Sequence, residues 1–206
     1  MVEGKCEMNP EKAFAPAAER NRAPILEVLS SCLSDGLVLE IGSGTGQHTA
    51  YFSSALPRIE WQPTEYDETR FDSIRAWVAD SGAENVRPVV HLDARSNVWP
   101  VDTVDAIYSA NVIHISPWTV TQGIFAGAER TLKPRGHLVL YGPFRFDGVW
   151  RAQSNQAFDE RLRSLNPTWG VRDIEDIKSI AQQHGLSLRK TVECPANNHC
   201  LIFSHS

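Results

Sequence analysis

The sequence predicts an α/β fold, with a doubly wound, Rossmann-like sheet of seven strands that ends in an antiparallel hairpin. Strand-like apolar runs alternate with helical patterns over residues 24–141, and the chain closes with two strand patterns that no helix separates. Such alternation favours right-handed crossovers and a parallel sheet covered on both faces. A glycine-rich turn directly after the first strand is a third sign of this fold class.

The first predicted element is a helix over residues 24–33, where Ile25 and Leu29 recur at helical spacing and Pro24 suits the first turn. Further helices are predicted over residues 47–55, 68–80 and 117–132. Short apolar runs predict parallel strands at residues 37–41, 59–63, 86–90, 104–109 and 137–141.

The end of the chain departs from this alternation. A helix is predicted over residues 173–184, and strands over residues 186–193 and 200–204 form the hairpin. Residues 142–172 are a long insertion rich in aromatic and polar side chains, and such insertions in compact domains are commonly functional. We expect one domain over residues 1–206, with residues 142–172 as a lid or substrate wall.

Composition narrows the class of protein. The net charge is -5 and no basic run exceeds two adjacent residues, so a nucleic-acid partner is not expected. The four cysteines are scattered without zinc-site spacing, so we expect reduced thiols and no metal. The start lacks an apolar leader and no membrane-spanning run follows. We expect a cytoplasmic protein away from membranes, either a monomer or a homodimer.

Residues 38–46, V-L-E-I-G-S-G-T-G, are the most informative motif. Gly42, Gly44 and Gly46 carry no Cβ, so the backbone can approach a ligand closely. The dinucleotide fingerprint needs a third glycine where this chain has Gln47. An NAD-dependent dehydrogenase is therefore the last of the enzyme hypotheses. The plainer alternative is a glycine turn that only packs a strand against a helix.

Glu40 stands two residues before the first glycine, and with it the run resembles motif I of the class I S-adenosylmethionine-dependent methyltransferases. In that family the carboxylate faces the cationic methionyl end of the cofactor, which is favourable electrostatics. The resemblance implies that S-adenosylmethionine is the cofactor. It assigns cofactor binding to Glu40, Gly42, Ser43, Gly44 and Gly46.

The ends of the next two strands carry further candidates for cofactor binding. Glu65 lies 65 - 46 = 19 residues beyond the last glycine, near the separation at which an acid binds ribose hydroxyls. Asp67 is the alternative, although it also suits a helix cap. Asp93 resembles the acid that accepts from the adenine amino group, with Ala94 offering its amide, and a turn-forming Asp is the alternative.

Residues 109–115, S-A-N-V-I-H-I, resemble methyltransferase motif IV, which assigns Asn111 to the cofactor site. His114 is the best-placed general base for an acceptor of high pKa, and a core or capping histidine is the alternative. Arg20 and Asn21 precede the first apolar helix pattern. Either they close over the cofactor and substrate, or they form a surface cluster at the helix entry.

Three segments narrow the resemblance: residues 14–26, F-A-P-A-A-E-R-N-R-A-P-I-L; residues 61–67, W-Q-P-T-E-Y-D; and residues 154–173. Together they resemble the methyltransferase-like twenty-six family, over nearly the whole chain. This family likeness implies the fold and the cofactor but does not identify the methyl acceptor.

The acceptor has to be inferred from the insertion. Phe146 and Trp150 make its wall apolar, which favours a small aromatic or hydrophobic molecule methylated at N or O. Core packing is the alternative for the aromatic side chains. The predicted substrate residues are Asn21, Tyr141, Phe144, Trp150, Asn155, Trp169 and Arg172.

The sequence therefore predicts an S-adenosylmethionine-dependent methyltransferase acting on a small molecule. A peptide or protein methyltransferase is the second hypothesis, and it requires an open groove in place of a lid. The third is a non-catalytic partner protein that binds S-adenosylmethionine without turnover.

Overall fold

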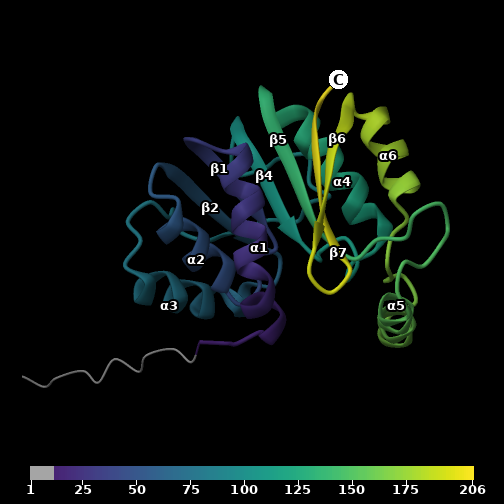
Figure 1. Cartoon of the computed structure of the whole chain (residues 1–206). Helices are drawn as coiled ribbons and strands as arrows, with labels where there is room; N and C mark the ends of the chain where they lie inside the picture. The colour runs from purple at the N-terminus through teal and green to yellow at the C-terminus, as the bar shows by residue number, and fades with distance from the viewer. Residues whose placement is uncertain (1–11) are drawn as a thin grey trace, which may run out of the picture.

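The computed structural model describes residues 12–206 and contains one seven-stranded sheet with the strand order β3-β2-β1-β4-β5-β7-β6 (Figure 1). Neighbouring strands among β1 to β5 pair in parallel, whereas β7 pairs antiparallel with both β5 and β6. The predicted doubly wound sheet with an antiparallel terminal hairpin is confirmed. The strands are β1 (Gly36–Ile41), β2 (Ile59–Glu65), β3 (Val90–His91), β4 (Val104–Ala110), β5 (Leu132–Gly142), β6 (Leu186–Cys194) and β7 (Asn198–His205).

The helices cover both faces of this sheet. One hydrophobic core lies under α1 and α2, where Leu29 and Phe52 pack on Val38, and the other lies under α4 and α6, where Phe125 and Ile177 pack. No helix within residues 12–206 has the length and apolar character to cross a membrane. The helices are α1 (Pro16–Cys32), α2 (Gln47–Ala55), α3 (Phe71–Ser81) after a short 3-10 turn η1 (Glu68–Arg70), α4 (Trp118–Thr131), α5 (Gln153–Leu165) and α6 (Ile174–Gln183).

Strand β5 begins five residues before its predicted start, at Leu132. Two other predicted boundaries are wrong for identifiable reasons. Helix α1 begins at Pro16, because that proline occupies the first turn and the alanine-rich run after it favours helix, so Pro24 lies inside the helix. Strand β3 is shorter than predicted, because Pro88 has no N–H to give to a ladder. Val86 makes only an isolated bridge to Trp61.

The insertion after β5 contains a helix that the sequence did not predict. Helix α5 buries Asn155, Asp159 and Leu162, so its inner face is largely polar and shows no apolar period. Figure 1 shows α5 at the lower edge, with the start of α1 and the turn between β6 and β7. The parallel strands β4 and β5 run toward this edge, so their carboxyl ends lie beside these three segments.

Candidate functional site

The glycine turn joins β1 to α2 at the carboxyl edge of the sheet. Gly42, Gly44 and Gly46 have φ angles of +75°, +58° and +90°, which only glycine adopts without strain. A Cβ at Gly46 would stand 2.6 Å from the Ile74 Cα, and one at Gly42 would stand 2.4 Å from a Val112 methyl. Two of the glycines therefore also serve packing. A Cβ at Gly44 would meet nothing within 4 Å, so this peptide faces open space.

The end of β2 holds the glycine turn in place. The amides of Gly42 and Ser43 donate to the Thr64 carbonyl at 3.0 and 2.9 Å. Glu65 Oε2 accepts from the Gly44 amide at 2.8 Å. The predicted ribose acid therefore lies directly against the open glycine.

Asp67 takes the plainer of its two predicted roles. Its Oδ1 accepts from the amide of Thr69 at 3.1 Å and caps η1. Asp67 is therefore committed to the turn, and Glu65 is the better ribose candidate.

Asp93 forms a two-sided ion pair with Arg95. The Arg95 Nη2 lies 2.6 Å from Oδ2 and Nε lies 2.9 Å from Oδ1, and the Arg95 amide also donates to Oδ1. These bonds lower the pKa of Asp93. Arg95 is exposed, and its guanidinium lies over the Tyr66 ring. Adenine recognition by Asp93 therefore competes with Arg95, whereas Ala94 is buried behind the turn.

Glu40 lies in the core between the sheet and α2. Its side chain is 2% exposed, and Oε2 accepts from Thr49 Oγ1 at 2.5 Å and from Trp61 Nε1 at 2.7 Å. Burial raises the pKa of Glu40 to about 7, although both hydrogen bonds oppose the rise. In this geometry Glu40 joins β1, β2 and α2 beneath the turn, while its predicted contact with the methionyl group stays a prediction.

The start of α1 contacts the first turn of α2. The Ala15 amide donates to Gln47 Oε1 at 2.6 Å, and Asn21 Oδ1 lies 2.7 Å from His48 Nε2. Asn21 is buried, whereas Arg20 is exposed. The predicted surface-cluster alternative therefore fits Arg20 better than Asn21.

Asn111 turns the chain after β4 with a φ of +61°. Its amide donates to the Tyr141 carbonyl at 2.8 Å, and its carbonyl accepts from the His114 amide at 3.0 Å. This turn fixes Asn111 beside the end of β5 and directs the His114 ring into the core under α4.

His114 is completely buried and lies edge-to-face on Phe144. Its Nδ1 accepts from the Arg172 amide at 3.4 Å, and a Cβ on Gly142 would stand 2.3 Å from its Nε2. Burial lowers the pKa of His114 to about 3. The ring is therefore neutral at pH 7 and poorly suited to take a proton, which favours the core-histidine alternative.

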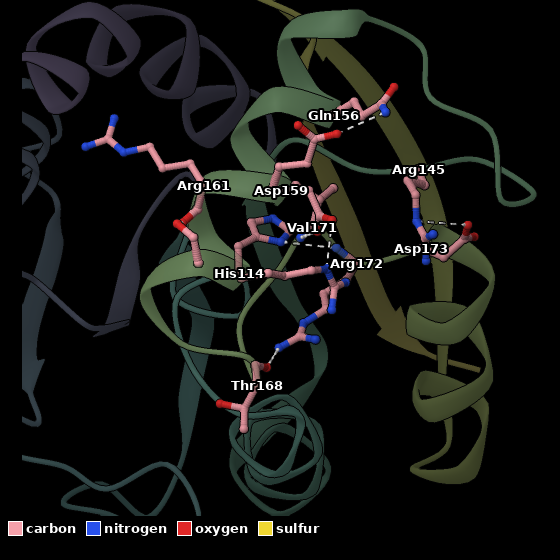
Figure 2. A network of polar contacts seen from close by, with 12 residues as sticks. His114, Arg145, Gln156, Asp159, Arg161, Thr168, Val171, Arg172 and Asp173 are labelled. Atoms are coloured by element: carbon pink, nitrogen blue, oxygen red, sulfur yellow. Dashed lines mark hydrogen bonds and ion pairs between the residues drawn. The ribbon is translucent and has the colours of Figure 1, made fainter.

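The segment that covers His114 is tied to α5 (Figure 2). Asp159 Oδ1 accepts from the Val171 amide at 2.7 Å, and its Oδ2 accepts from Arg163 Nε at 2.7 Å. In Figure 2 the Arg172 guanidinium reaches away from the ring toward Thr168. It donates to the carbonyls of Ile113, Ser116 and Thr168, so Arg172 supports this loop and is not free to bind a substrate.

The other predicted substrate residues do not form one wall. Tyr141 packs in the core under α1 and α2, whereas Phe144 packs in the core under α4 and α6. Asn155 Nδ2 donates to the Asn197 carbonyl at 3.0 Å, so it joins α5 to the hairpin turn. Trp150 and Trp169 are half-buried, so theirs are the aromatic rings left to pack against an acceptor, whereas Tyr141 has only its hydroxyl to offer at the end of β5.

Comparison with known proteins identifies the family. The family described as "Protein of unknown function (DUF938)" matches residues 12–205. The chain belongs to this family.

Solved methyltransferases share the fold of this DUF938 chain. Mitomycin 7-O-methyltransferase MmcR has a TM-score of 0.76 and 17% identity, over 90% of this chain and 54% of that one. An O-methyltransferase family 2 protein from Planctomyces limnophilus in complex with apigenin has a TM-score of 0.77 and 18% identity, over 92% and 58%. CalO1 from calicheamicin biosynthesis, in its SAH-bound form, has a TM-score of 0.72 and 16% identity, over 90% and 54%. The chain thus spans about half the length of these enzymes, and at this identity the likeness shows the fold.

Two residues of the DUF938 chain, Gln47 and His48, make contacts that the sequence did not predict. Gln47 replaces the third glycine of a dinucleotide turn, and its side chain instead binds the start of α1. His48 makes a second contact with α1 through Asn21, and its Nδ1 lies 3.1 Å from the Tyr108 hydroxyl on β4. Within residues 12–206 no group of three or more His, Cys, Asp or Glu side chains is arranged to hold a metal ion.

Proposed function

We propose that this DUF938 protein is an S-adenosylmethionine-dependent methyltransferase that methylates a small aromatic or hydrophobic molecule at O or N. The observation that carries the proposal is the pairing of the open Gly44 peptide with the Glu65 carboxylate at the carboxyl edge of the sheet. Sequence segments 14–26, 61–67 and 154–173 further support membership of the methyltransferase-like twenty-six family.

The residues at the glycine turn fit S-adenosylmethionine. No side chain fills the space in front of Gly44, and Glu65 Oε2, which accepts from the Gly44 amide, has a second lone pair for a ribose hydroxyl at the same point. Asp93 and Ala94 lie after β3, on the far side of Glu65, where an adenine is expected once Arg95 releases the carboxylate. When bound, the cofactor supplies an electrophilic methyl group on a positively charged sulfur.

The chain's own contribution is positioning and exclusion of water. Methyl transfer needs the acceptor atom in line with the methyl carbon and the sulfur, and a dry, rigid site favours that geometry. Asn155 attaches α5 to the turn between β6 and β7, and Asp159 attaches it to the loop that covers His114. This attachment favours an enclosed acceptor site over the open groove that a peptide substrate needs.

The test is methyl transfer from radiolabelled S-adenosylmethionine to a panel of phenols, aromatic carboxylates and aromatic amines. The proposal predicts labelled small-molecule product whose mass rises by one methylene group. Label transferred only to peptides would favour the second hypothesis. Binding of S-adenosylhomocysteine with no transfer to either class would favour the non-catalytic partner protein.

A further inference from the structure

A buried set of side chains connects the sheet to helix α1 through the ring of His48. Tyr108, His48 and Asn21 are 1%, 8% and 8% exposed. The Tyr108 hydroxyl lies 3.1 Å from His48 Nδ1, and His48 Nε2 lies 2.7 Å from Asn21 Oδ1. The ring thus joins β4 to α1 at the first turn of α2, directly after the glycine turn.

The direction of these hydrogen bonds follows from simple chemistry. Burial lowers the pKa of His48 to about 4, so one ring nitrogen carries a hydrogen and the other accepts. The Asn21 Oδ1 atom can only accept, so Nε2 donates to it and Nδ1 accepts from the Tyr108 hydroxyl. The Ala18 backbone also faces the ring and favours its protonated form, as an acceptor does.

This direction fixes the Asn21 amide. Because Oδ1 is used by His48, the N–H bonds of the amide point to the other side. The Tyr141 phenol at the end of β5 is the group that this amide reaches: burial raises the pKa of Tyr141 to about 12, whereas a hydrogen bond with the Asn21 side chain and the charge of Arg20 oppose the rise. A hydrogen bond lowers the pKa of a phenol when it is donated to the phenol oxygen, which agrees with this orientation.

We propose that His48 is a positioning residue of the candidate site, which holds Asn21 so that its amide N–H faces Tyr141 and the carboxyl end of β5. This end of the site then offers hydrogen-bond donors, the Asn21 amide and the Tyr141 hydroxyl, to an oxygen atom of the bound acceptor. The acceptor class is therefore an oxygen-bearing aromatic molecule, such as a phenol or an aromatic carboxylate. The acceptor assignment rests on the proposed function, whereas the arrangement of His48 and Asn21 does not.

The first measurement needs no ligand. Nitrogen NMR of the imidazole rings at pH 7, with His48 assigned by its loss in H48Q, is expected to show a pyridine-like Nδ1 and a pyrrole-like Nε2. N21D places a carboxylate against Nε2 and is expected to raise the pKa of His48 by about one to two pH units. N97D, the same change at an exposed loop position, is expected to leave it unaltered. A protonated Nδ1 in the wild type overturns the proposal.

The second measurement follows the side-chain amide of Asn21. H48Q keeps an N–H donor toward Asn21 and is expected to retain the wild-type amide resonances. H48M has neither donor nor acceptor of that kind and is expected to lose them. Identical Asn21 resonances in wild type, H48Q and H48M would show that His48 does not position the amide.

The ligand measurement uses protein saturated with S-adenosylhomocysteine and two probes, benzoate and benzylamine. Benzoate is expected to shift the Asn21 amide resonances and to bind about tenfold more weakly to H48M, because one hydrogen bond to a charged group is lost. Benzylamine is expected to leave these resonances in place. Equal shifts with both probes, or none with benzoate, overturn the acceptor assignment. Absence of S-adenosylhomocysteine binding contradicts the proposed function itself, while the imidazole measurement still decides the role of His48.

Discussion

The Gly44 amide donates to the Glu65 carboxylate at 2.8 Å, and this contact joins the end of β2 to the open peptide of the glycine turn. Glu65 also accepts from the amides of Tyr66 and Asp67 at 2.9 and 3.0 Å through its other oxygen. A ligand that binds in front of Gly44 therefore meets a carboxylate already oriented by the backbone. The predictions below depend on this arrangement and on the buried titratable groups around it.

Gly44→Ala and Gly46→Ala separate ligand approach from packing. Both glycines have positive φ, but only an alanine at 46 would press its Cβ against the backbone of α3. We expect G44A to lose about 1 kcal/mol of stability and G46A to lose about 2 kcal/mol or more. S-adenosylhomocysteine affinity should nevertheless fall about tenfold in G44A, since its Cβ occupies the open space. Urea unfolding and calorimetric titration measure the two effects, and unchanged affinity in G44A would count against ligand binding at this peptide.

Glu40 should make the protein less stable as the pH rises. Its folded pKa of about 7 lies above the ordinary glutamate value of 4.5, so between these values the folded state binds more protons than the unfolded state. Stability from this group is therefore lost across that window, by about 3 kcal/mol in total. Unfolding measured from pH 4.5 to 8 should show this slope in wild type and not in E40Q. Parallel pH curves for the two proteins would contradict a buried, titrating Glu40.

His114 should make the protein less stable as the pH falls. Its folded pKa of about 3 lies below the ordinary histidine value of 6.5, so between these values the unfolded state binds more protons. The stability that the neutral ring contributes is present above pH 6.5 and is lost as the pH falls toward 3. In H114Q the free energy of unfolding should fall less steeply as the pH drops from 6.5 to 3, although the lost packing lowers stability at every pH. If stability falls equally steeply with pH in H114Q and wild type, the loss belongs to another group, and His48 is the first to test.

Asp159 should control the loop that covers His114. D159N keeps an oxygen for the Val171 amide but removes the charge that pairs with Arg163. We expect a loss of about 1 to 3 kcal/mol and faster amide exchange in residues 166–172. R163Q is the matched control, because its side chain lies at the exposed end of the pair and an exposed partner contributes less. Equal exchange in D159N and wild type would show that the charge of Asp159 does not hold this loop.

The sequence was most informative where local pattern and structure coincide. The apolar runs predicted β1, β2, β4 and the terminal hairpin, because buried parallel strands are apolar on both faces. Spacing from the glycines predicted Glu65, which the structure places on the turn. Helix α5 escaped prediction because its buried face consists of Asn155, Asp159 and a single leucine.

The partners of Gln47 and His48 depend on contacts that no local pattern reveals. Gln47 binds Ala15 and His48 binds Asn21, across separations of 32 and 27 residues. The role of His114 was equally hidden, because its complete burial follows from the loop after α5 and not from its neighbours in sequence. The sequence shows that Gln47 stands where a dinucleotide turn has its third glycine, but it does not show that Gln47 contacts the start of α1.

Calorimetric titration of S-adenosylhomocysteine into wild type, E65Q and E68Q tests the central claim most directly. Glu65 faces the glycine turn, whereas Glu68 is exposed in η1. E68Q is therefore the control, because it makes the same substitution away from the turn. We predict that wild type and E68Q bind with equal affinity and that E65Q binds about tenfold more weakly, because a charged hydrogen-bond acceptor is lost. No binding by wild type, or equal affinity in all three proteins, would contradict a methyl-donor site at this turn.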